Sequence, residues 1–196
     1  MSARATVPGL DYWQFPAEKP DVPPNPQGWF SPENAAVLAR LLNSATRQVI
    51  ELGSWLGMST RHIASCAPNA TIFAVDHWLG SSEHIIEFRH LLENLYETFL
   101  VNCWEYRDRI VPCRADTSTG LIVLHHYNVS PDLIYIDASH DYESVRRDIK
   151  MCRQYFPSAQ IVGDDWGWTS VRRAVIDELG ENAIDATGNC WWIKSQ

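Results

Sequence analysis

Carboxylates and one histidine cluster in two short segments of the chain. Asp137 is followed by His140 and Asp141 in the run DASHDY, and Asp164 and Asp165 stand together in the run GDDW. Carboxylates held close together repel unless a positive charge cancels theirs, and a hard divalent cation such as Mg²⁺ prefers oxygen ligands. A histidine three residues beyond Asp137 can take a proton from a cation-bound hydroxyl. The two segments therefore indicate metal-assisted chemistry on a hydroxyl group.

These residues also have a purely structural interpretation. Asp164 or Asp165 could cap a helix that is expected to begin near Ser170, and His140 could cap the helix that follows it. Both segments follow predicted strands, so in a parallel sheet they meet at the same edge. That placement favours a shared site, although the capping alternative stays open for each residue taken singly.

A turn with two glycines follows the first predicted strand, in the run ELGSWLGMS at residues 51–59. Gly53 and Gly57 allow the backbone of the turn to approach a ligand, and the following helix presents its first amides to it. The dinucleotide fingerprint G-x-G-x-x-G is incomplete, because Trp55 and Met58 occupy its second and third glycine places. The turn therefore disfavours a pyrophosphate.

Three further carboxylates stand at the ends of successive predicted strands. Glu51 ends the first strand, Asp76 ends the second where it can accept both ribose hydroxyls of a nucleoside, and Asp116 follows the third where it can face an adenine edge. Each alone could equally bind local amides or cap a helix. Together they favour a nucleoside-containing ligand.

The elements that carry these residues alternate regularly. Continuous apolar runs are separated by patterns with one buried helical stripe, which is typical of a parallel sheet covered by helices on both faces. A final pair of β-rich runs around a Gly188-Asn189 turn predicts an antiparallel hairpin strand at the sheet edge, giving seven strands in all. The predicted strands are 48–52, 71–75, 109–113, 132–137, 160–164, 183–187 and 190–194. One helix is predicted after each of the first five strands, at residues 58–66, 82–104, 117–127, 142–155 and 170–179.

The start of the chain has a different character. Seven of the eleven prolines fall in the first 32 residues, so residues 1–30 are expected to form an extended arm, either a flap or a tail. Ser31, Pro32 and Glu33 form a good helix start. With 196 residues and 45% hydrophobic composition, residues 31–196 are expected to form a single domain.

Composition excludes several classes of protein. The formal net charge of −8 argues against a nucleic-acid partner, and no apolar run approaches the ~20 residues that span a bilayer. The first fifteen residues lack the apolar block of a secretory signal, and the five cysteines include no C-x-x-C pair. A cytoplasmic location with reduced thiols is expected, and the sequence allows a homo-oligomer.

The motifs E-x-G-x-x-x-G-x-S, the strand-end Asp76, D-A-S-H-D-Y and G-D-D-W, in this order, resemble those of the class I S-adenosylmethionine-dependent methyltransferases. More narrowly, they are similar to the cation-dependent O-methyltransferases, which include catechol, caffeoyl-CoA and macrolide-sugar enzymes. The resemblance covers about Ser31 to Lys194 and implies a Rossmann-like, doubly wound α/β fold. The chain departs from it at the proline-rich arm, where many relatives have a long substrate-covering segment.

The resemblance also implies roles. S-adenosylmethionine is the expected cofactor, and Mg²⁺ or Mn²⁺ the expected cation, with Asp137, Asp164 and Asp165 as ligands. His140 stands where the catechol and caffeoyl-CoA enzymes have a lysine base and the macrolide-sugar enzymes a histidine, so the acceptor is expected to be a small hydroxylated molecule, sugar-like or an aromatic diol. The implied cofactor contacts are Glu51, Gly53, Ser54, Trp55, Gly57, Ser59, Asp76, His77, Asp116 and Asp137.

Tryptophans could supply the acceptor pocket. Trp55, Trp78, Trp166 and Trp168 are all predicted on loops at the edge where the strands end, and they could stack on a sugar or a flat ring. Two other functions stay open: a nucleotide-binding oxidoreductase, which the missing glycines disfavour, and a non-catalytic nucleoside-binding or scaffold module.

Overall fold

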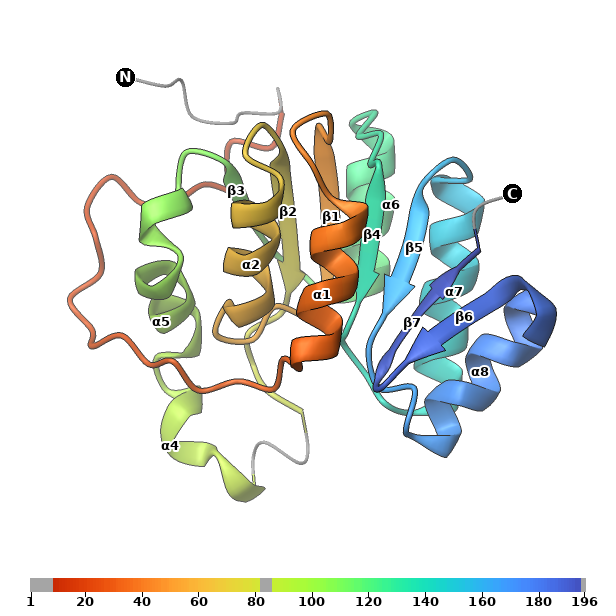
Figure 1. Cartoon of the computed structure of the whole chain (residues 1–196). Helices are drawn as coiled ribbons and strands as arrows, with labels where there is room; N and C mark the ends of the chain where they lie inside the picture. The colour runs from red at the N-terminus through yellow and green to blue at the C-terminus, as the bar shows by residue number, and fades with distance from the viewer. Residues whose placement is uncertain (1–8, 82–85, 195–196) are drawn as a thin grey trace.

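The computed structural model describes residues 9–81 and 86–194 of the chain. They form one seven-stranded sheet in the order β3-β2-β1-β4-β5-β7-β6 (Figure 1). The first five strands are parallel, β7 is antiparallel to β5, and β6 is antiparallel to β7. The predicted fold class is confirmed. The strands are β1 (Gln48–Leu52), β2 (Thr71–Asp76), β3 (Ile110–Arg114), β4 (Leu133–Ile136), β5 (Gln160–Gly163), β6 (Ile184–Thr187) and β7 (Cys190–Ile193).

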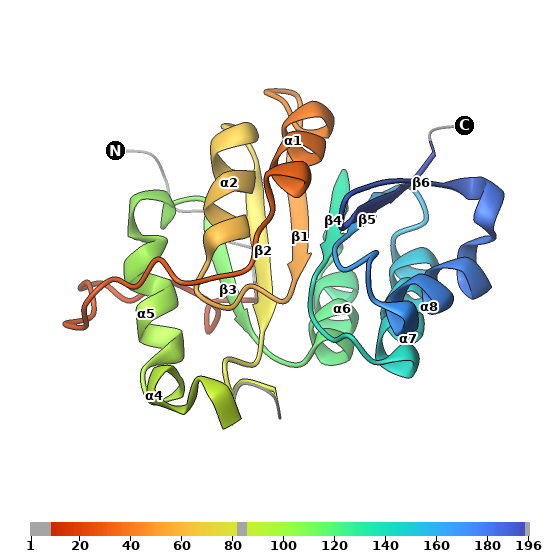
Figure 2. The ribbon, with the colours of Figure 1, turned by 60° about the horizontal axis from the view of Figure 1, so that its bottom comes forward.

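Helices cover both faces of the sheet. On one face lie α1 (Pro32–Leu41), α2 (Met58–Cys66) and α5 (Leu95–Asn102), and on the other lie α6 (Thr117–His126), α7 (Tyr142–Tyr155) and α8 (Thr169–Leu179) (Figure 2). The short elements are α4 (Arg89–Leu92) and the 3-10 turns η1 (Trp104–Tyr106) and η2 (Glu181–Ala183). Within the described ranges, no helix is long and apolar enough to cross a bilayer.

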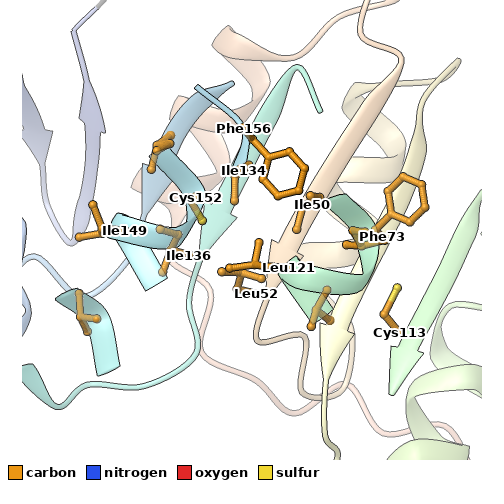
Figure 3. Close-up of a cluster of buried hydrophobic side chains, with 14 of the residues drawn as sticks. Ile50, Leu52, Phe73, Cys113, Leu121, Ile134, Ile136, Ile149, Cys152 and Phe156 are labelled. Carbon is orange, nitrogen blue, oxygen red and sulfur yellow. The ribbon is translucent and has the colours of Figure 1, made fainter. Parts of the chain in front are cut away.

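Alternate residues of each central strand enter different cores, because successive strand side chains point to opposite faces. Ile50 and Leu52 of β1 pack with Ile134 of β4 under α6 and α7 (Figure 3). Val49 and Tyr135 lie in the second core, under α1 and α2. Both faces are buried, which explains why these strands are continuous apolar runs. Each buried large aliphatic side chain contributes roughly 1.5–3 kcal/mol.

The strand order reverses between β1 and β4, which is where ligands of open α/β sheets bind. The turns after these two strands touch there. A Cβ built on Gly53 would lie 2.0 Å from the backbone oxygen of Asp137, and Gly53 has a φ of +85°. Only glycine satisfies both conditions. Gly53 is thus required for the close approach of the two turns.

The helix predicted over residues 142–155 is confirmed in its bounds and in its buried stripe, which includes Val145, Ile149 and Cys152. The single helix predicted over residues 82–104 is wrong. Its first four residues lie outside the described ranges, and the remainder contains α4 and α5, separated at Glu93 and Asn94. No residue of α4 is buried, whereas Leu95 and Phe99 of α5 are, so the apolar residues of this segment do not share one buried stripe.

The arm expected over residues 1–30 is described from residue 9 onward. Leu10 and Trp13 are buried in one core and Phe15 in the other. Farther along, the Asn25 amide donates to the side-chain oxygen of Asn102 in α5, and the Asn102 amide group donates back to the Asn25 carbonyl. The arm is therefore anchored along its length, and it reaches α1 at the N-cap Ser31.

Candidate active site

Two clefts share one wall at the carboxyl ends of the parallel strands. The first cleft, of about 540 Å³, lies beside Asp76 and Asp116. The second cleft, of about 790 Å³, lies beside Asp164 and Asp165. The shared wall consists of Gly53, Trp55, Asp137, Ala138, His140 and Trp168. A group bound in one cleft can therefore meet a group bound in the other at this wall.

Asp76 holds the glycine turn in place. Its Oδ2 accepts hydrogen bonds from the amides of Ser54 at 3.0 Å and Trp55 at 2.9 Å, and its Oδ1 accepts one from the Trp78 amide at 2.7 Å. Trp55 has a φ of 45°, a left-handed conformation that costs a non-glycine residue about 1–2 kcal/mol. Asp76 lines the first cleft, so its carboxylate both fixes this strained turn and faces the ligand space.

Asp116 is the N-cap of α6. Its carboxylate accepts from the Thr119 amide at 3.0 Å and from the Thr119 hydroxyl at 2.7 Å, and these bonds lower the pKa of Asp116. It also lines the first cleft, as do His77 and two residues of α7 that the sequence analysis missed, Arg147 and Asp148. Capping and ligand contact are compatible at this position.

Glu51 lies behind the shared wall and is fully buried. Its Oε2 accepts from the hydroxyls of Ser54 and Thr60, while its Oε1 has no hydrogen-bond partner among the residues that the structure describes. Burial raises the pKa of Glu51 to about 7. A buried acceptor without a partner costs about 1–3 kcal/mol. Through Ser54 and Thr60, Glu51 thus ties the glycine turn to the start of α2 from behind the shared wall.

His140 and Asp165 form a pair in the second cleft. The Nε2 of His140 lies 2.9 Å from Oδ2 of Asp165, and the indole of Trp168 stacks on the imidazole at a centroid distance of 4.7 Å. The capping alternative is wrong for these residues. Asp141 caps α7, and α8 begins after Trp168 without a side-chain cap. The imidazole is thus held by a carboxylate on its edge and an indole on its face.

Asp164 is held by a buried chain of hydrogen bonds. The Tyr135 hydroxyl donates to its Oδ2 at 3.2 Å, the Asn34 amide donates to the Tyr135 hydroxyl at 2.9 Å, and the Asp165 amide donates to its Oδ1 at 2.6 Å. Burial raises the pKa of Asp164. Burial, together with Asp164 and Asp165, raises the pKa of Asp137 well above its usual range. Burial and neighbouring carboxylates therefore disfavour the charged forms of Asp137 and Asp164.

Asp137, Asp164 and Asp165 suit a divalent cation by their chemistry but not by their spacing. All three are oxygen donors that line the second cleft, which suits a hard divalent ion. Yet in the part of the chain that the structure describes, no three histidine, cysteine, aspartate or glutamate side chains are grouped closely enough to hold a metal ion. Asp165 is instead paired with His140. The donor chemistry fits a cation, and the spacing of the side chains does not.

Aromatic side chains surround the second cleft, but only two of them are among those predicted. Trp55 and Trp168 line it, together with Trp29 from the arm, which no motif marked, and Phe88, which helical spacing had assigned to the buried stripe of the helix predicted over residues 82–104. The prediction for Trp78 is wrong: it is 2% exposed and packs on Tyr96 and Phe99. Trp166 lines a separate hollow beside α8. The proline-rich composition around Trp29 could not show where that residue lies.

The structure brings most of the predicted site residues to the two clefts. Glu51 and Gly57 are the exceptions, since they line neither cleft and lie within or behind the turn. Those that line the first cleft are Gly53, Trp55, Asp76, His77, Asp116, Asp137 and His140. Those that line the second are Gly53, Ser54, Trp55, Ser59, Asp137, His140, Asp164 and Asp165.

Comparison with known proteins agrees with this architecture. The family model described as a methyltransferase domain matches residues 50–166, which is more than half of the chain. No curated protein sequence matches. Among solved structures, the TDP-rhamnose 3′-O-methyltransferase of calicheamicin biosynthesis is 15% identical with a TM-score of 0.56, covering 82% of this chain and 76% of that one.

Two further solved structures show how widely the fold is used. An O-methyltransferase from Bacillus cereus, in complex with SAH, is 18% identical with a TM-score of 0.56, covering 84% of this chain and 82% of that one. A chain of the fibrillarin/Nop5p complex is 20% identical with a TM-score of 0.56, covering 89% and 90%. At these identities the likeness concerns the fold alone. Together with the family match, it shows that the chain belongs to the methyltransferase domain family and has the fold of class I S-adenosylmethionine-dependent methyltransferases.

Proposed function

We propose that this methyltransferase transfers the methyl group of S-adenosylmethionine to a hydroxyl of a small molecule, sugar-like or an aromatic diol. The observation that carries the proposal is the His140–Asp165 pair at 2.9 Å, next to the wall that separates the two clefts. A base at this position can reach an acceptor in the second cleft beside a cofactor in the first. O-methyltransferases among the structural neighbours support the same reaction type.

The first cleft is the proposed cofactor site. Asp76, Asp116 and Gly53 line it, and the space that a Cβ would occupy at Gly53 is closed by Asp137. S-adenosylmethionine, when bound, supplies a methyl group on a positively charged sulfur. The role of the protein is to hold the nucleoside between these carboxylates and to exclude water from the shared wall.

His140 is the proposed general base. A hydroxyl is a weak nucleophile at neutral pH, so removal of its proton as the bond forms lowers the barrier. Asp165 fixes the ring through Nε2 and stabilises the imidazolium that results, and Trp168 keeps the ring plane in position. The proton taken from the acceptor is then held on His140 beside a carboxylate.

A divalent cation, Mg²⁺ or Mn²⁺, is a second part of the proposal. Asp137, Asp164 and Asp165 would hold it, and it would lower the pKa of the acceptor hydroxyl and neutralise the repulsion between the carboxylates. The oxygen donors of the three aspartates support this proposal. Because Asp165 is paired with His140, the cation is tested separately from the base.

The test is a methyl-transfer assay with methyl-labelled S-adenosylmethionine and a panel of sugars and diols, with and without EDTA. The cation proposal predicts that EDTA abolishes transfer, that Mg²⁺ or Mn²⁺ restores it, and that Asp164→Asn, which does not remove either member of the His140–Asp165 pair, behaves like EDTA. Asp185→Ala, at an exposed residue paired with Lys194, is the control variant. Full activity in EDTA would remove the cation. Absence of label from every hydroxyl acceptor, with label found on nitrogen or carbon acceptors, would refute O-methylation.

A cytoplasmic location, a homo-oligomeric state and the absence of a nucleic-acid partner stay predictions. The fibrillarin neighbour comes from a complex with another protein, but this chain carries a formal net charge of −8, which is unfavourable for binding nucleic acid. A small-molecule acceptor accords better with the aromatic lining of the second cleft.

A further inference from the structure

Acidic side chains line the second cleft. Four carboxylates line it, those of Glu87, Asp137, Asp164 and Asp165. Among the residues that the structure describes, no lysine or arginine does, and the other titratable side chain on its lining is that of His140. The first cleft is also acidic, since five aspartates line it, but its lining includes one arginine, Arg147. Among the described residues, the second cleft therefore has no lysine or arginine that could pair with an anionic group, whereas the first cleft has one.

The second cleft also holds the exposed tryptophans. The molecule has nine tryptophans, all within the described ranges, and only Trp29 and Trp168 are exposed, at 53% and 46%. Both line this cleft. Trp29 packs against Phe88 at a centroid distance of 5.0 Å and against Trp55 at 5.7 Å. Large indole surfaces left in solvent beside a cleft are suited to the face of a ring.

Resting on the proposed function, we infer that the acceptor is a neutral or positively charged ring compound, and that the second cleft rejects acceptors bearing phosphate or carboxylate groups. Four carboxyl groups, those of Glu87, Asp137, Asp164 and Asp165, line this cleft, and no lysine or arginine among the described residues stands beside them to pair with an acidic group of an acceptor, so the lining is acidic. An acceptor linked to a nucleoside diphosphate or to coenzyme A would bring several more negative charges against it.

Glu87 is the residue that can test this inference without touching the proposed chemistry. It is exposed, lines the second cleft and is adjacent in sequence to Phe88, which lines the cleft as well. Glu87→Lys replaces one negative charge by a positive one at the lining. Glu181→Lys makes the same change of net charge at an exposed residue of η2, outside the lining of both clefts.

The experiment is calorimetric titration of the SAH-saturated protein with three diols that share one ring and differ in charge: dopamine, 4-methylcatechol and 3,4-dihydroxybenzoate. We expect dopamine and 4-methylcatechol to bind about fivefold to tenfold or more tightly than 3,4-dihydroxybenzoate, and the difference to shrink in ~0.5 M NaCl. Glu87→Lys should reduce the difference, Glu181→Lys should preserve it, and Trp29→Ala should weaken all three diols alike.

Equal or tighter binding of 3,4-dihydroxybenzoate by the wild-type protein would overturn the charge part of the inference. Binding of none of the three diols, with SAH still bound, would overturn the ring part while leaving the methyltransferase assignment intact. Failure of SAH itself to bind would refute the proposed function and, with it, this inference.

Discussion

The contact between His140 and Asp165 joins two residues that the sequence could assign only to separate roles. The motif D-x-x-H marked His140 as a base and the paired aspartates as cation ligands, but neither pattern predicts a 2.9 Å contact between them. Asp165 also has a φ of 62°, a left-handed conformation with a cost for aspartate that only the surrounding structure can offset. Such strain at this residue is consistent with a side chain held for function.

His140→Gln is expected to lower kcat by ~10²-fold to 10⁴-fold, the usual contribution of general base catalysis, with SAH affinity unchanged. Glutamine keeps the polar edge facing Asp165 but does not hold the proton. Steady-state rates and SAH calorimetry on the same preparation measure both quantities, with His126→Gln at an exposed histidine as the control. A stable His140→Gln protein with the wild-type kcat would show that another group takes the proton.

Glu51→Gln is expected to separate stability from cofactor binding. The pKa of Glu51 is about 7 in the folded protein against an ordinary value of 4.5, so the folded state binds more protons than the unfolded state across that interval. Wild-type stability therefore falls as pH rises from about 5 to 7, by about 3 kcal/mol at most. The free energy of unfolding of Glu51→Gln should not show this fall with pH. At pH 8 the variant should be more stable relative to the wild-type protein than it is at pH 5, yet it should bind SAH more weakly.

Urea unfolding at several pH values, with SAH titrations at pH 8, tests this prediction. A variant that unfolds with the same pH dependence as the wild-type protein would show that Glu51 is ionised throughout. Unchanged SAH affinity would assign its buried carboxyl group to structure alone.

At the scale of elements, the arm and α5 are joined through Asn102. Its side chain bonds the backbone of Asn25 on both sides and also donates to the Leu56 carbonyl in the glycine turn at 2.7 Å. Trp55 in the same turn donates from its indole to Gln27 at 2.6 Å. The arm is thus tied to the turn that carries the shared wall.

Asn102→Ala should loosen the arm and cost about 1–3 kcal/mol of unfolding free energy, because backbone groups lose buried partners. The KM for the acceptor should rise several-fold more than the Kd for SAH, since the arm supplies Trp29 to the second cleft only. Asn69→Ala, which removes a single bond to the Ser44 carbonyl, is the control. Equal losses for acceptor and cofactor would show that the arm acts on the turn as a whole.

The elements with strong periodicity could be predicted from sequence, and those without it could not. The stripe of α7 and the apolar runs of β1, β2 and β4 follow directly from burial, so their bounds agree closely. The segment at residues 86–104 has apolar residues at helical spacing, but it forms short helices, and of α4 and α5 only α5 has buried residues. A repeat in the sequence cannot show which surface each turn of a helix will meet.

At the scale of the whole molecule, the sequence could place residues at the sheet edge but not divide that edge into two clefts. Strand order puts Gly53 and Asp137 together, and the division depends on contacts made by distant segments. Trp29 comes from the arm, Phe88 from the segment before α4, and Asn34 from the first turn of α1 supports Asp164 through Tyr135. No local pattern encodes these long-range contacts.

The central claim is that the first cleft binds S-adenosylmethionine, and calorimetric titration of the whole chain with SAH and with NADH tests it most directly. We predict one SAH bound per chain and no heat from NADH, because Trp55 and Met58 stand where a dinucleotide needs glycines. Gly53→Ala should abolish SAH binding, since the added Cβ would collide with the backbone of Asp137. Binding of NADH with no binding of SAH would contradict the account.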